Sequence, residues 1–350
     1  MKTKAAIHKT FGQPLIIDEV EVPDPRPGQV VVKLISTGVC HSQLHQIKDP
    51  TLPRPAILGH EAAGVVTKVG RDVRDLTEGD HAIVTWIPKT PVIGRRPYIR
   101  SGVTYKKELI YENTVYAWAE DVLTEAEFVV PISKDEPTDV ASIVGCAVLT
   151  GAGAVLHTAK VRTGDSVAVF GVGGVGLSSI AAASILGAYP IIAVDLKDEK
   201  LEFARQFGAT HFINASNIEP IQKIVEITGG GADFAFDTIG VRITNEQILP
   251  SVRAGGPGAD NIGGTAVLVG VPGSEMTIDP GLFMKGQRRY VGSAGATYPV
   301  RDFEIFLRWH RDGKFPLDKL VTKRYSLEDI NEACEDLENG RILGRAIIEI

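Results

Sequence analysis

Two cysteines and one histidine, far apart in the sequence, are of the types that bind a catalytic metal ion. Cys40 lies in GVCHSQLH, His60 follows 20 residues later in LGHEAAG, and Cys146 lies a further 86 residues on in VGCAVLTG. Thiolates and imidazole are preferred zinc ligands, and three protein ligands leave a fourth tetrahedral position open, as in catalytic zinc sites. These spacings contain no local motif of the C-x-x-C type. Cysteines buried in an apolar core and a hydrogen-bonded structural histidine therefore remain alternatives.

A second motif has the pattern of a phosphate-binding turn. In SVAVFGVGGVG, Gly171, Gly173 and Gly176 follow an apolar strand with G-x-G-x-x-G spacing, with Gly174 and Val175 between the last two. The first glycine permits the tight turn, the second allows close approach of a pyrophosphate, and the third allows close packing of helix and strand. The helix N-terminus then offers free N–H groups to the phosphates. The strand, turn and helix together predict a dinucleotide site.

The cofactor predicted at this turn is NAD rather than NADP. Asp195 ends the next strand, 19 residues after Gly176. A carboxylate there can accept hydrogen bonds from the adenosine ribose and would repel a 2′-phosphate. Lys200, in the following helix, is a candidate for an additional ribose contact. The alternatives are that Asp195 only caps the helix beginning near Asp198 and that Lys200 is a solvated surface residue.

The elements that must position these residues form two regions. Residues 1 to about 150 read as short strands separated by Pro/Gly-rich turns such as 23–28 and 49–55, with little helix. From about residue 160, apolar strands alternate with segments of helix length, which predicts a parallel sheet covered on both faces. After about residue 290 the pattern is mixed and ends in the strand GRAIIEI. We therefore expect the chain to return to the first region.

Composition and charge exclude several classes of protein. The chain has 350 residues, 44% of them hydrophobic, which is enough for two domains with proper cores. Its net charge of −6 is spread over short runs, without the basic block typical of nucleic-acid binding. We find no stretch of about 18 apolar residues and no apolar segment of a signal peptide. The three separated cysteines fit a reducing compartment. We therefore expect a cytoplasmic protein without nucleic-acid or membrane partners.

The segments GVCHSQLH, LGHEAAG, VGCAVLTGAGA, GVGGVG and AVD, in this order, resemble the zinc-dependent alcohol dehydrogenases of the medium-chain dehydrogenase/reductase superfamily. The similarity covers nearly the whole chain, including the C-terminal SLEDINEACEDLENGRILGRAIIEI. It implies an α/β Rossmann NAD-binding domain with a doubly wound parallel sheet at 151–290. It also implies a GroES-like all-β catalytic zinc domain at 1–150 and 291–350. The implied activity is reversible oxidation of a primary or secondary alcohol to an aldehyde or ketone, by zinc-alkoxide formation, proton relay and hydride transfer to NAD.

The resemblance implies roles for residues around the metal. Three residues match the family's catalytic zinc ligands: Cys40, His60 and Cys146. Glu61 matches a carboxylate that can approach the metal during ligand exchange. Ser42 and His45 match a relay that passes the substrate proton by way of the cofactor ribose to solvent. Trp86 matches an aromatic residue lining the substrate pocket, with a domain-core aromatic as the alternative.

Further residues match cofactor contacts in the family. His41 matches a phosphate contact, and Arg345, in GRAIIEI, matches a pyrophosphate contact. Thr150, Val175 and Val271 match residues packed around the nicotinamide. The implied cofactors are NAD and one catalytic Zn²⁺ per subunit.

One departure concerns a second, structural zinc. The family often has four closely spaced cysteines in the lobe corresponding to residues 87–123, but this lobe contains none. On ligand count we expect no structural zinc, with the lobe held by packing and hydrogen bonds. Its basic residues would steer an anionic substrate or, as the favoured alternative, form a solvated loop face: Arg95, Arg96, Arg100, Lys106 and Lys107.

A second departure is Gln43, which stands where the family usually has an aspartate that orients the histidine ligand. A neutral carbonyl can still accept the imidazole N–H, but it donates less electron density to the ligand. We expect a shift in metal affinity or pH profile and no change in ligand identity.

Two other functions remain open: a zinc-free quinone or enone reductase of the same superfamily, and a non-catalytic NAD-binding protein built on this fold. The reductase would have no reason to keep the four residues of the metal site. A zinc-binding interaction module conflicts with the open coordination position. The expected partner is a small-molecule alcohol or carbonyl compound. The segment 265–273 and the residues after it resemble the region through which these enzymes pair, which predicts a homodimer, with a homotetramer as the alternative.

Overall fold

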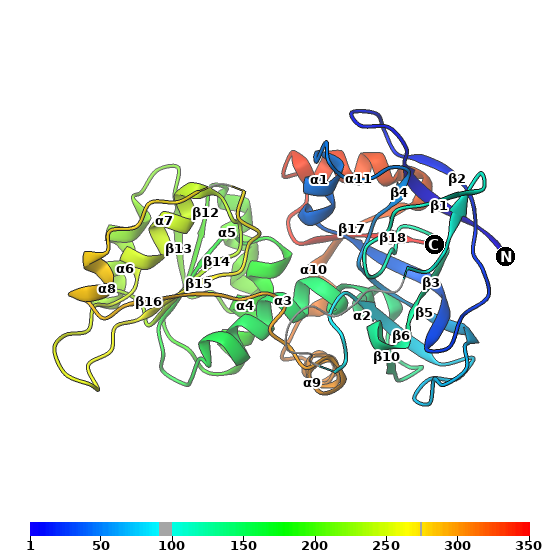
Figure 1. The fold of residues 1–350 in the computed structure, drawn as a ribbon. Coiled ribbons are helices and arrows are strands. Elements are labelled where there is room, and N and C mark those ends of the chain that lie inside the picture. Colours follow the sequence, from blue (N-terminus) through cyan, green and yellow to red (C-terminus); the bar gives the residue numbers. More distant parts are fainter. Residues whose placement is uncertain (91–99, 274) are drawn as a thin grey trace. The chain divides into compact units, whose positions relative to one another are not determined.

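The computed structural model describes residues 1–90, 100–273 and 275–350 (Figure 1). The chain forms two compact units. The first comprises Met1–Cys146, Tyr298–Arg308 and Leu317–Ile350, and the second comprises Ala147–Thr297 and Trp309–Pro316. The sequence predicted domain limits at residues 150 and 290. In the structure the chain leaves the first unit after Cys146 and first returns to it at Tyr298.

The first unit is built on two β-sheets. One sheet has the strand order β4-β1-β2-β7-β8, and the other has the order β10-β6-β5-β3-β18-β17, with β9 also paired to β3. The strands of the first sheet are β1 (Lys2–His8), β2 (Ile16–Glu21), β4 (Ala56–Ile57), β7 (Thr104–Tyr105) and β8 (Glu108–Leu109). Those of the second are β3 (Gln29–Val39), β5 (Glu61–Val69), β6 (His81–Thr85), β9 (Asp121–Glu125), β10 (Val129–Ile132), β17 (Val321–Ser326) and β18 (Arg345–Glu349). The mostly β character expected for this region is confirmed.

Short helices cover the sheets of this unit. They are α1 (His41–Ile47), α2 (Thr138–Ile143), α10 (Leu317–Leu320) and α11 (Ile330–Glu338), and α9 (Pro299–Arg311) begins in it. In α11, Ile330, Ala333 and Leu337 recur at helical spacing, and all three are buried against a cluster that includes Leu44 of α1. The C-terminal segment therefore helps to fix α1, the helix that follows Cys40.

The second unit contains a six-stranded parallel sheet with the order β13-β12-β11-β14-β15-β16. Its strands are β11 (Val167–Phe170), β12 (Ile191–Asp195), β13 (His211–Asn214), β14 (Phe234–Asp237), β15 (Thr265–Leu268) and β16 (Arg289–Gly292). The helices of this unit are α3 (Leu149–Gly153), α4 (Gly174–Ile185), α5 (Asp198–Ala204), α6 (Pro220–Thr228), α7 (Arg242–Ser251) and α8 (Gly281–Met284).

This sheet has the doubly wound topology of a Rossmann domain. Numbered within the sheet, its strands follow the order 3-2-1-4-5-6. All four residues of β11 are buried, because helices such as α4 and α7 pack on a sheet whose central strands have no solvent face (Figure 1). The predicted α/β fold class is confirmed.

One long apolar segment was overlooked in the sequence. Among the described residues, Thr138–Ala159 forms one helix that is long and apolar enough to span a membrane, so the expectation of no such stretch was wrong. However, 83% of its most apolar 18-residue window is buried inside the protein. Small residues such as Gly145 and Gly151 allow it to pack closely, since a Cβ at either would meet backbone oxygen within 2.6 Å. The segment is thus a core helix by its burial.

The described part of the lobe 87–123 is held by buried polar contacts. Glu112 accepts hydrogen bonds from the backbone N–H (2.5 Å) and the hydroxyl (2.6 Å) of Ser101. Trp118, fully buried, donates its indole N–H to the carbonyl of Gly38 at 3.2 Å. Of the basic residues noted in this lobe, Arg95 and Arg96 lie outside the described residues. The absence of a structural zinc stays a prediction.

We expect His8 to make the protein sensitive to mild acid. His8 ends β1, is 0% exposed, and neither of its ring nitrogens has a hydrogen-bond partner in the described parts of the chain. Burial, reinforced by Arg54, lowers the pKa of His8. The unfolded chain then binds a proton that the folded chain does not, so the free energy of unfolding should fall as the pH drops through about 6.5. Denaturant titrations between pH 7.5 and 5 should show a smaller fall in His8→Leu, and parallel curves would contradict this account.

Candidate functional site

The three predicted metal ligands come from elements that meet at one edge of the second sheet in the first unit. Cys40 directly follows β3, and His60 directly precedes β5. These strands are antiparallel with Thr37 opposite Ala62, so continuing the register brings the end of β3 beside the start of β5. Cys146 lies in a π-helical turn, Val144–Val148, a feature often found at functional sites. The hydroxyl of Thr85, the last residue of β6, donates to the carbonyl of Gly145 at 2.8 Å and fixes this turn.

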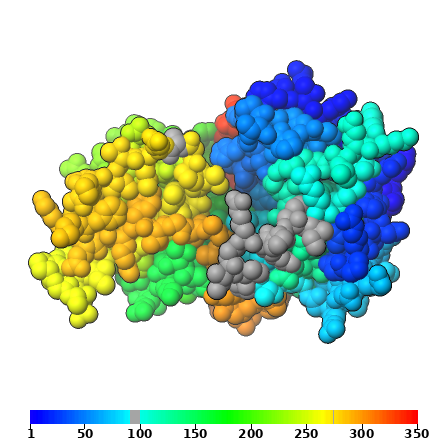
Figure 2. Space-filling model, viewed as in Figure 1, coloured from blue at the N-terminus to red at the C-terminus, as the bar shows by residue number. Residues whose placement is uncertain are grey.

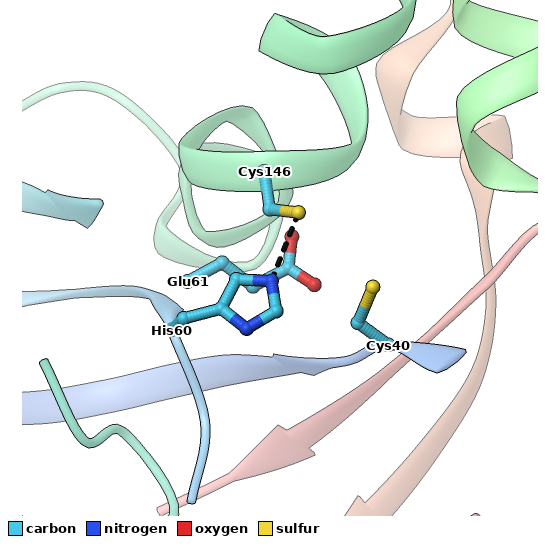
Figure 3. A group of neighbouring side chains, drawn as sticks. All are labelled: Cys40, His60, Glu61 and Cys146. Carbon is cyan, nitrogen blue, oxygen red and sulfur yellow. Dashed lines mark hydrogen bonds between the residues drawn. The ribbon is translucent and has the colours of Figure 1, made fainter. Parts of the chain in front are cut away.

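The side chains of Cys40, His60, Glu61 and Cys146 converge in the structure (Figure 3). One ligand atom from each lies within 4.8 Å of all the others, and His60 Nε2 is 3.0 Å from Cys146 Sγ. Zinc–ligand bonds of about 2.0–2.3 Å place atoms on one ion less than about 4.6 Å apart, so the cluster has nearly the size of a zinc site. Two sulfurs, one imidazole and a nearby carboxylate form a donor set that zinc prefers.

A buried ion pair completes the cluster. Arg345, the first residue of β18, hydrogen-bonds the carboxylate of Glu61, with side-chain exposures of only 5% and 1%. Gly38 makes room for this arrangement, since a Cβ there would lie 2.4 Å from the Glu61 carboxyl carbon. This pair could not be predicted from the sequence, because β18 reaches β3 only through tertiary pairing, with Ala346 opposite Val39. The predicted contact of Arg345 with a pyrophosphate stays a prediction.

The charged groups of this cluster perturb one another. The hydrogen bond with Cys146, although opposed by burial, holds the pKa of the Cys40 thiol well below its usual range, and Arg345 adds to this effect. The same sulfur contact raises the pKa of Cys146. Burial raises the pKa of Glu61 despite the neighbouring guanidinium. A divalent cation would relieve this competition, because metal coordination deprotonates thiols outright.

The two predicted relay residues lie on α1, next to the cluster. Ser42 is half-buried, and its Oγ has no hydrogen-bond partner among the described residues. His45 is exposed and follows three residues later, so the two side chains share one face of the helix. The arrangement suits a hydroxyl that takes a proton inside the protein and an imidazole that meets water. His41, at the start of α1, is exposed.

Trp86 stands beside the metal cluster and also packs on the core of the first unit. Its indole meets the His60 ring edge-on, with ring centroids 6.4 Å apart. It is only partly buried, and the hydrophobic cluster beneath it includes Val84 and Leu123. The packing on this core fits the alternative of a domain-core aromatic, and the role of Trp86 in lining a substrate pocket stays a prediction.

The glycine turn in the second unit is tight and closely packed at two of its three motif glycines. Gly171 has φ +88°, where glycine is favoured. A Cβ at Gly176 would lie 1.8 Å from the carbonyl oxygen of Gly171, so only glycine allows α4 to pack here. A Cβ at Gly173 would meet nothing within 4 Å, which leaves open space above the N-terminus of α4. Gly174 and Val175 form the first turn of this helix.

Asp195 lies beside the glycine turn, at the end of β12. Its carboxylate accepts hydrogen bonds from the backbone N–H of Val172 (3.0 Å) and of Leu196 (2.7 Å). The same carboxylate also accepts a hydrogen bond from the backbone N–H of Lys197, the N-cap residue of α5, at 3.3 Å, so it holds the chain at the start of this helix as well. Lys200 is half-buried in the first turns of α5. This position suits a ribose contact near a pyrophosphate bound at the turn.

Of the remaining predicted cofactor residues of the second unit, Thr150 lies in α3 and Val271 follows β15 by three residues. Thr150 has a buried hydroxyl without a partner in the described structure, and Val271 is 59% exposed. Two residues at the glycine turn were not predicted from the sequence: Thr238 and Ile239, which follow β14. Thr238 donates to the carbonyl of Gly171 at 2.9 Å, and a Cβ at Gly171 would strike Ile239. A polar residue directly after an apolar strand was the signal that could have revealed Thr238.

Comparisons with known proteins agree with this geometry. Residues 26–134 match the family model for an alcohol dehydrogenase GroES-like domain, and residues 174–311 match that for a zinc-binding dehydrogenase. An NDMA-dependent alcohol dehydrogenase of Amycolatopsis methanolica is 34% identical over 97% of both chains. An S-(hydroxymethyl)glutathione dehydrogenase of Saccharomyces cerevisiae is 33% identical over 98% of this chain and 95% of its own. The crystal structure of a benzyl alcohol dehydrogenase from Acinetobacter calcoaceticus superposes with a TM-score of 0.89 at 30% identity, covering 100% of this chain and 99% of that one.

The chain belongs to the zinc-type alcohol dehydrogenases of the medium-chain dehydrogenase/reductase superfamily. It is therefore an oxidoreductase that acts on alcohols. Family membership and the four-residue cluster together argue against a zinc-free reductase of the same superfamily.

Two glycine variants separate packing from cofactor binding at the turn. Gly176→Ala should destabilise the protein by about 1–3 kcal/mol, because its Cβ collides with backbone. Gly173→Ala should leave the melting temperature unchanged and weaken NAD binding by about tenfold or more, because its methyl group fills the space needed by the pyrophosphate. Thermal unfolding and fluorescence titration with NADH measure the two effects. Unchanged NADH affinity in Gly173→Ala would contradict the assigned turn.

Proposed function

We propose that this enzyme oxidises a primary or secondary alcohol to an aldehyde or ketone with NAD, reversibly, at a single zinc ion held by Cys40, His60 and Cys146. The observation that carries the proposal is the convergence of these ligand atoms, with Glu61, within 4.8 Å. The match of this unit to the alcohol dehydrogenase GroES-like domain supports it. We assign zinc binding to the domain 1–150 and 291–350 and NAD binding to the domain 151–290.

The chain's own residues supply positioning and proton transfer. When bound, zinc acts as a Lewis acid toward the substrate oxygen, and NAD accepts the hydride. In this proposal the Ser42 hydroxyl takes the proton of the substrate alcohol and passes it by way of the cofactor ribose to His45, whose exposed imidazole releases it to solvent. In the reduction, the same groups return a proton to the product oxygen. Arg345 holds Glu61 beside the three metal ligands. The Glu61 carboxylate could then approach the metal while one ligand is exchanged for another.

In the second unit, backbone and carboxylate groups orient the cofactor. The N-terminus of α4 and the space over Gly173 accommodate the pyrophosphate. Asp195 accepts hydrogen bonds from the ribose and favours NAD over NADP. Thr150, Val175 and Val271 would contact the nicotinamide, and His41, Lys200 and Arg345 would contribute the remaining polar contacts.

Relatives guide the choice of substrate. Benzyl alcohol and S-(hydroxymethyl)glutathione, named for a structural neighbour and a sequence relative, both carry a primary alcohol group. The aromatic face of Trp86 beside His60 suits a flat alcohol such as an aryl carbinol. We therefore place aromatic primary alcohols first among the candidates and keep secondary alcohols as the second class. A cytoplasmic location also belongs to this proposal.

The proposal includes a homodimer formed through the second unit. Strand β16 ends the parallel sheet, and its outer edge pairs with no other strand in the described part of the chain. Exposed apolar side chains precede it, with Phe283 38% and Met284 85% exposed. In Figure 2 the gold-to-orange part of the chain, which holds α8 and β16, lies uncovered on the visible face. An unpaired edge next to exposed apolar side chains favours association with a second copy.

A cysteine pair tests the metal assignment. Cys40→Ser should lose most bound zinc and reduce kcat/KM for benzyl alcohol by about a thousandfold or more, because the ion and its Lewis acidity are lost. Cys334→Ser is the matched control, since Cys334 is a buried free cysteine far from the cluster in sequence and outside it. Zinc by inductively coupled plasma mass spectrometry and NADH formation are the measurements. Full activity in Cys40→Ser, or a wild-type protein purified with no zinc, would refute the proposal.

The dimer has its own test. Met284→Lys should shift the mass measured by light scattering from two chains toward one, because a buried charge at the interface is costly. Leu109→Lys, an equally drastic change at a 63% exposed leucine in β8, should leave the mass unchanged. If Met284→Lys and the wild type had equal masses, the proposed interface at Met284 would be wrong.

A further inference from the structure

One peptide group of the glycine turn is held at both ends by side chains from neighbouring strands. This group joins Gly171 to Val172, and its N–H donates to the carboxylate of Asp195 at 3.0 Å. Its carbonyl oxygen accepts a hydrogen bond from the hydroxyl of Thr238 at 2.9 Å. Asp195 ends β12 and Thr238 directly follows β14, and these two strands flank β11 in the sheet. The turn after β11 is therefore held from both sides.

The two hydrogen bonds fix the orientation of this peptide plane. A peptide group is planar, so its carbonyl and its N–H point in opposite directions and must turn together. Gly171 has φ +88° and, without a Cβ, has access to conformations that other residues avoid. The peptide that follows such a residue rotates easily unless something restrains it. Hydrogen bonds at both of its ends supply that restraint.

Thr238 is itself fixed by the chain around it. Its backbone N–H donates to the carbonyl of Phe170 at 3.0 Å, and its hydroxyl lies 3.0 Å from the same oxygen, so the hydroxyl proton can be shared with the Gly171 carbonyl. The preceding residue, Asp237, is 0% exposed. Its carboxylate accepts hydrogen bonds from the backbone N–H of Ile239 (2.8 Å) and of Gly240 (3.0 Å). The loop that carries the hydroxyl is thus well ordered.

The shape of the side chain alone does not require a threonine at this position. A Cβ added at Gly171 would lie 3.1 Å from the Thr238 hydroxyl oxygen, and one added at Gly176 would lie 3.0 Å from it, so the hydroxyl packs closely against the turn. Valine would fill the same space, because it has a methyl group where threonine has the hydroxyl. Only the hydroxyl donates a hydrogen bond to the turn.

We propose that Thr238 is a positioning residue for the cofactor, whose hydroxyl fixes the Gly171–Val172 peptide and, through it, the carboxylate of Asp195. The inference rests on the proposed binding of NAD at this turn. A turn that is ordered in advance loses less conformational entropy when a pyrophosphate binds. A fixed Asp195 carboxylate also stays where it accepts hydrogen bonds from the ribose and repels a 2′-phosphate. Thr238 therefore contributes both to the affinity for NAD and to the discrimination against NADP.

Three variants separate the hydrogen bond from the packing of this side chain. Thr238→Val removes the hydroxyl and keeps the branched shape, whereas Thr238→Ser keeps the hydroxyl and removes the methyl group. The matched control is Thr163→Val, because the Thr163 hydroxyl also donates to a backbone carbonyl, that of Leu186 at 2.8 Å. Thr163 precedes β11, so it lies at the opposite end of this strand from the glycine turn. Melting curves identify any variant that fails to fold.

The measurements report on the turn with and without cofactor. Hydrogen–deuterium exchange of residues 168–176, followed by mass spectrometry without cofactor, should be faster in Thr238→Val because the turn opens more often. Fluorescence titrations should show NADH binding weakened by about three- to tenfold, the loss expected for one hydrogen bond. The ratio of the NADPH to the NADH dissociation constant should fall, and KM for NAD should rise without loss of kcat. Thr238→Ser should restore most of the NADH affinity, and Thr163→Val should match the wild type.

The outcomes distinguish failure of this inference from failure of the proposed function. If the wild type binds NADH and Thr238→Val binds it equally well, the positioning role is refuted, whatever the exchange rate, and the assignment of NAD stands. If Thr163→Val weakens NADH binding as strongly as Thr238→Val, the effect is a general one and the inference is again refuted. A wild type that does not bind NADH overturns both the inference and the proposed cofactor.

Discussion

The first unit brings two cysteine side chains and one histidine side chain together in a place that is largely closed to solvent. The ligand atoms of Cys40, His60 and Cys146 lie within one small cluster although their residues are far apart in the chain. Strand pairing fixes their positions, because a register slip by one residue would turn every side chain of a strand to the opposite face. The hydroxyl of Thr85 then ties the turn that carries Cys146 to the end of β6. Sheet register is therefore the constraint on which the metal site rests.

The charged groups beside the candidate metal ligands are better explained by a role at the metal site than by a contribution to the free energy of unfolding. A buried ion pair such as Glu61–Arg345 contributes little net stability, because both charges lose their hydration. It is nevertheless accommodated, with Gly38 leaving the space that the carboxylate occupies. The side-chain amide of Gln43 contacts Nδ1 of His60 from α1. The four side chains of the cluster lie close enough together to hold one metal ion.

In the second unit, the predicted binding of a phosphate depends mainly on backbone groups and less on side chains. A phosphate needs N–H donors and room for close approach, and the glycine turn at the end of β11 provides both. Asp195 is held against this turn by the N–H of Val172, so the carboxylate keeps a fixed position relative to the turn. The parallel sheet brings the loop after β14 to the same edge, where Thr238 secures the turn.

The sequence alone determined the parallel α/β fold, because uninterrupted apolar strands and the spacing of Gly171, Gly173 and Gly176 are local patterns set by backbone sterics. It also supplied the metal-ligand candidates, through several short motifs occurring in a family's order rather than through their spacing. Tertiary structure alone decided the rest. The pairing of Arg345 with Glu61 and the contact of Gln43 with His60 join segments that only sheet register and helix packing bring together. The long apolar segment Thr138–Ala159 showed its place as a core helix only by its burial, because hydropathy does not distinguish a protein interior from a lipid one.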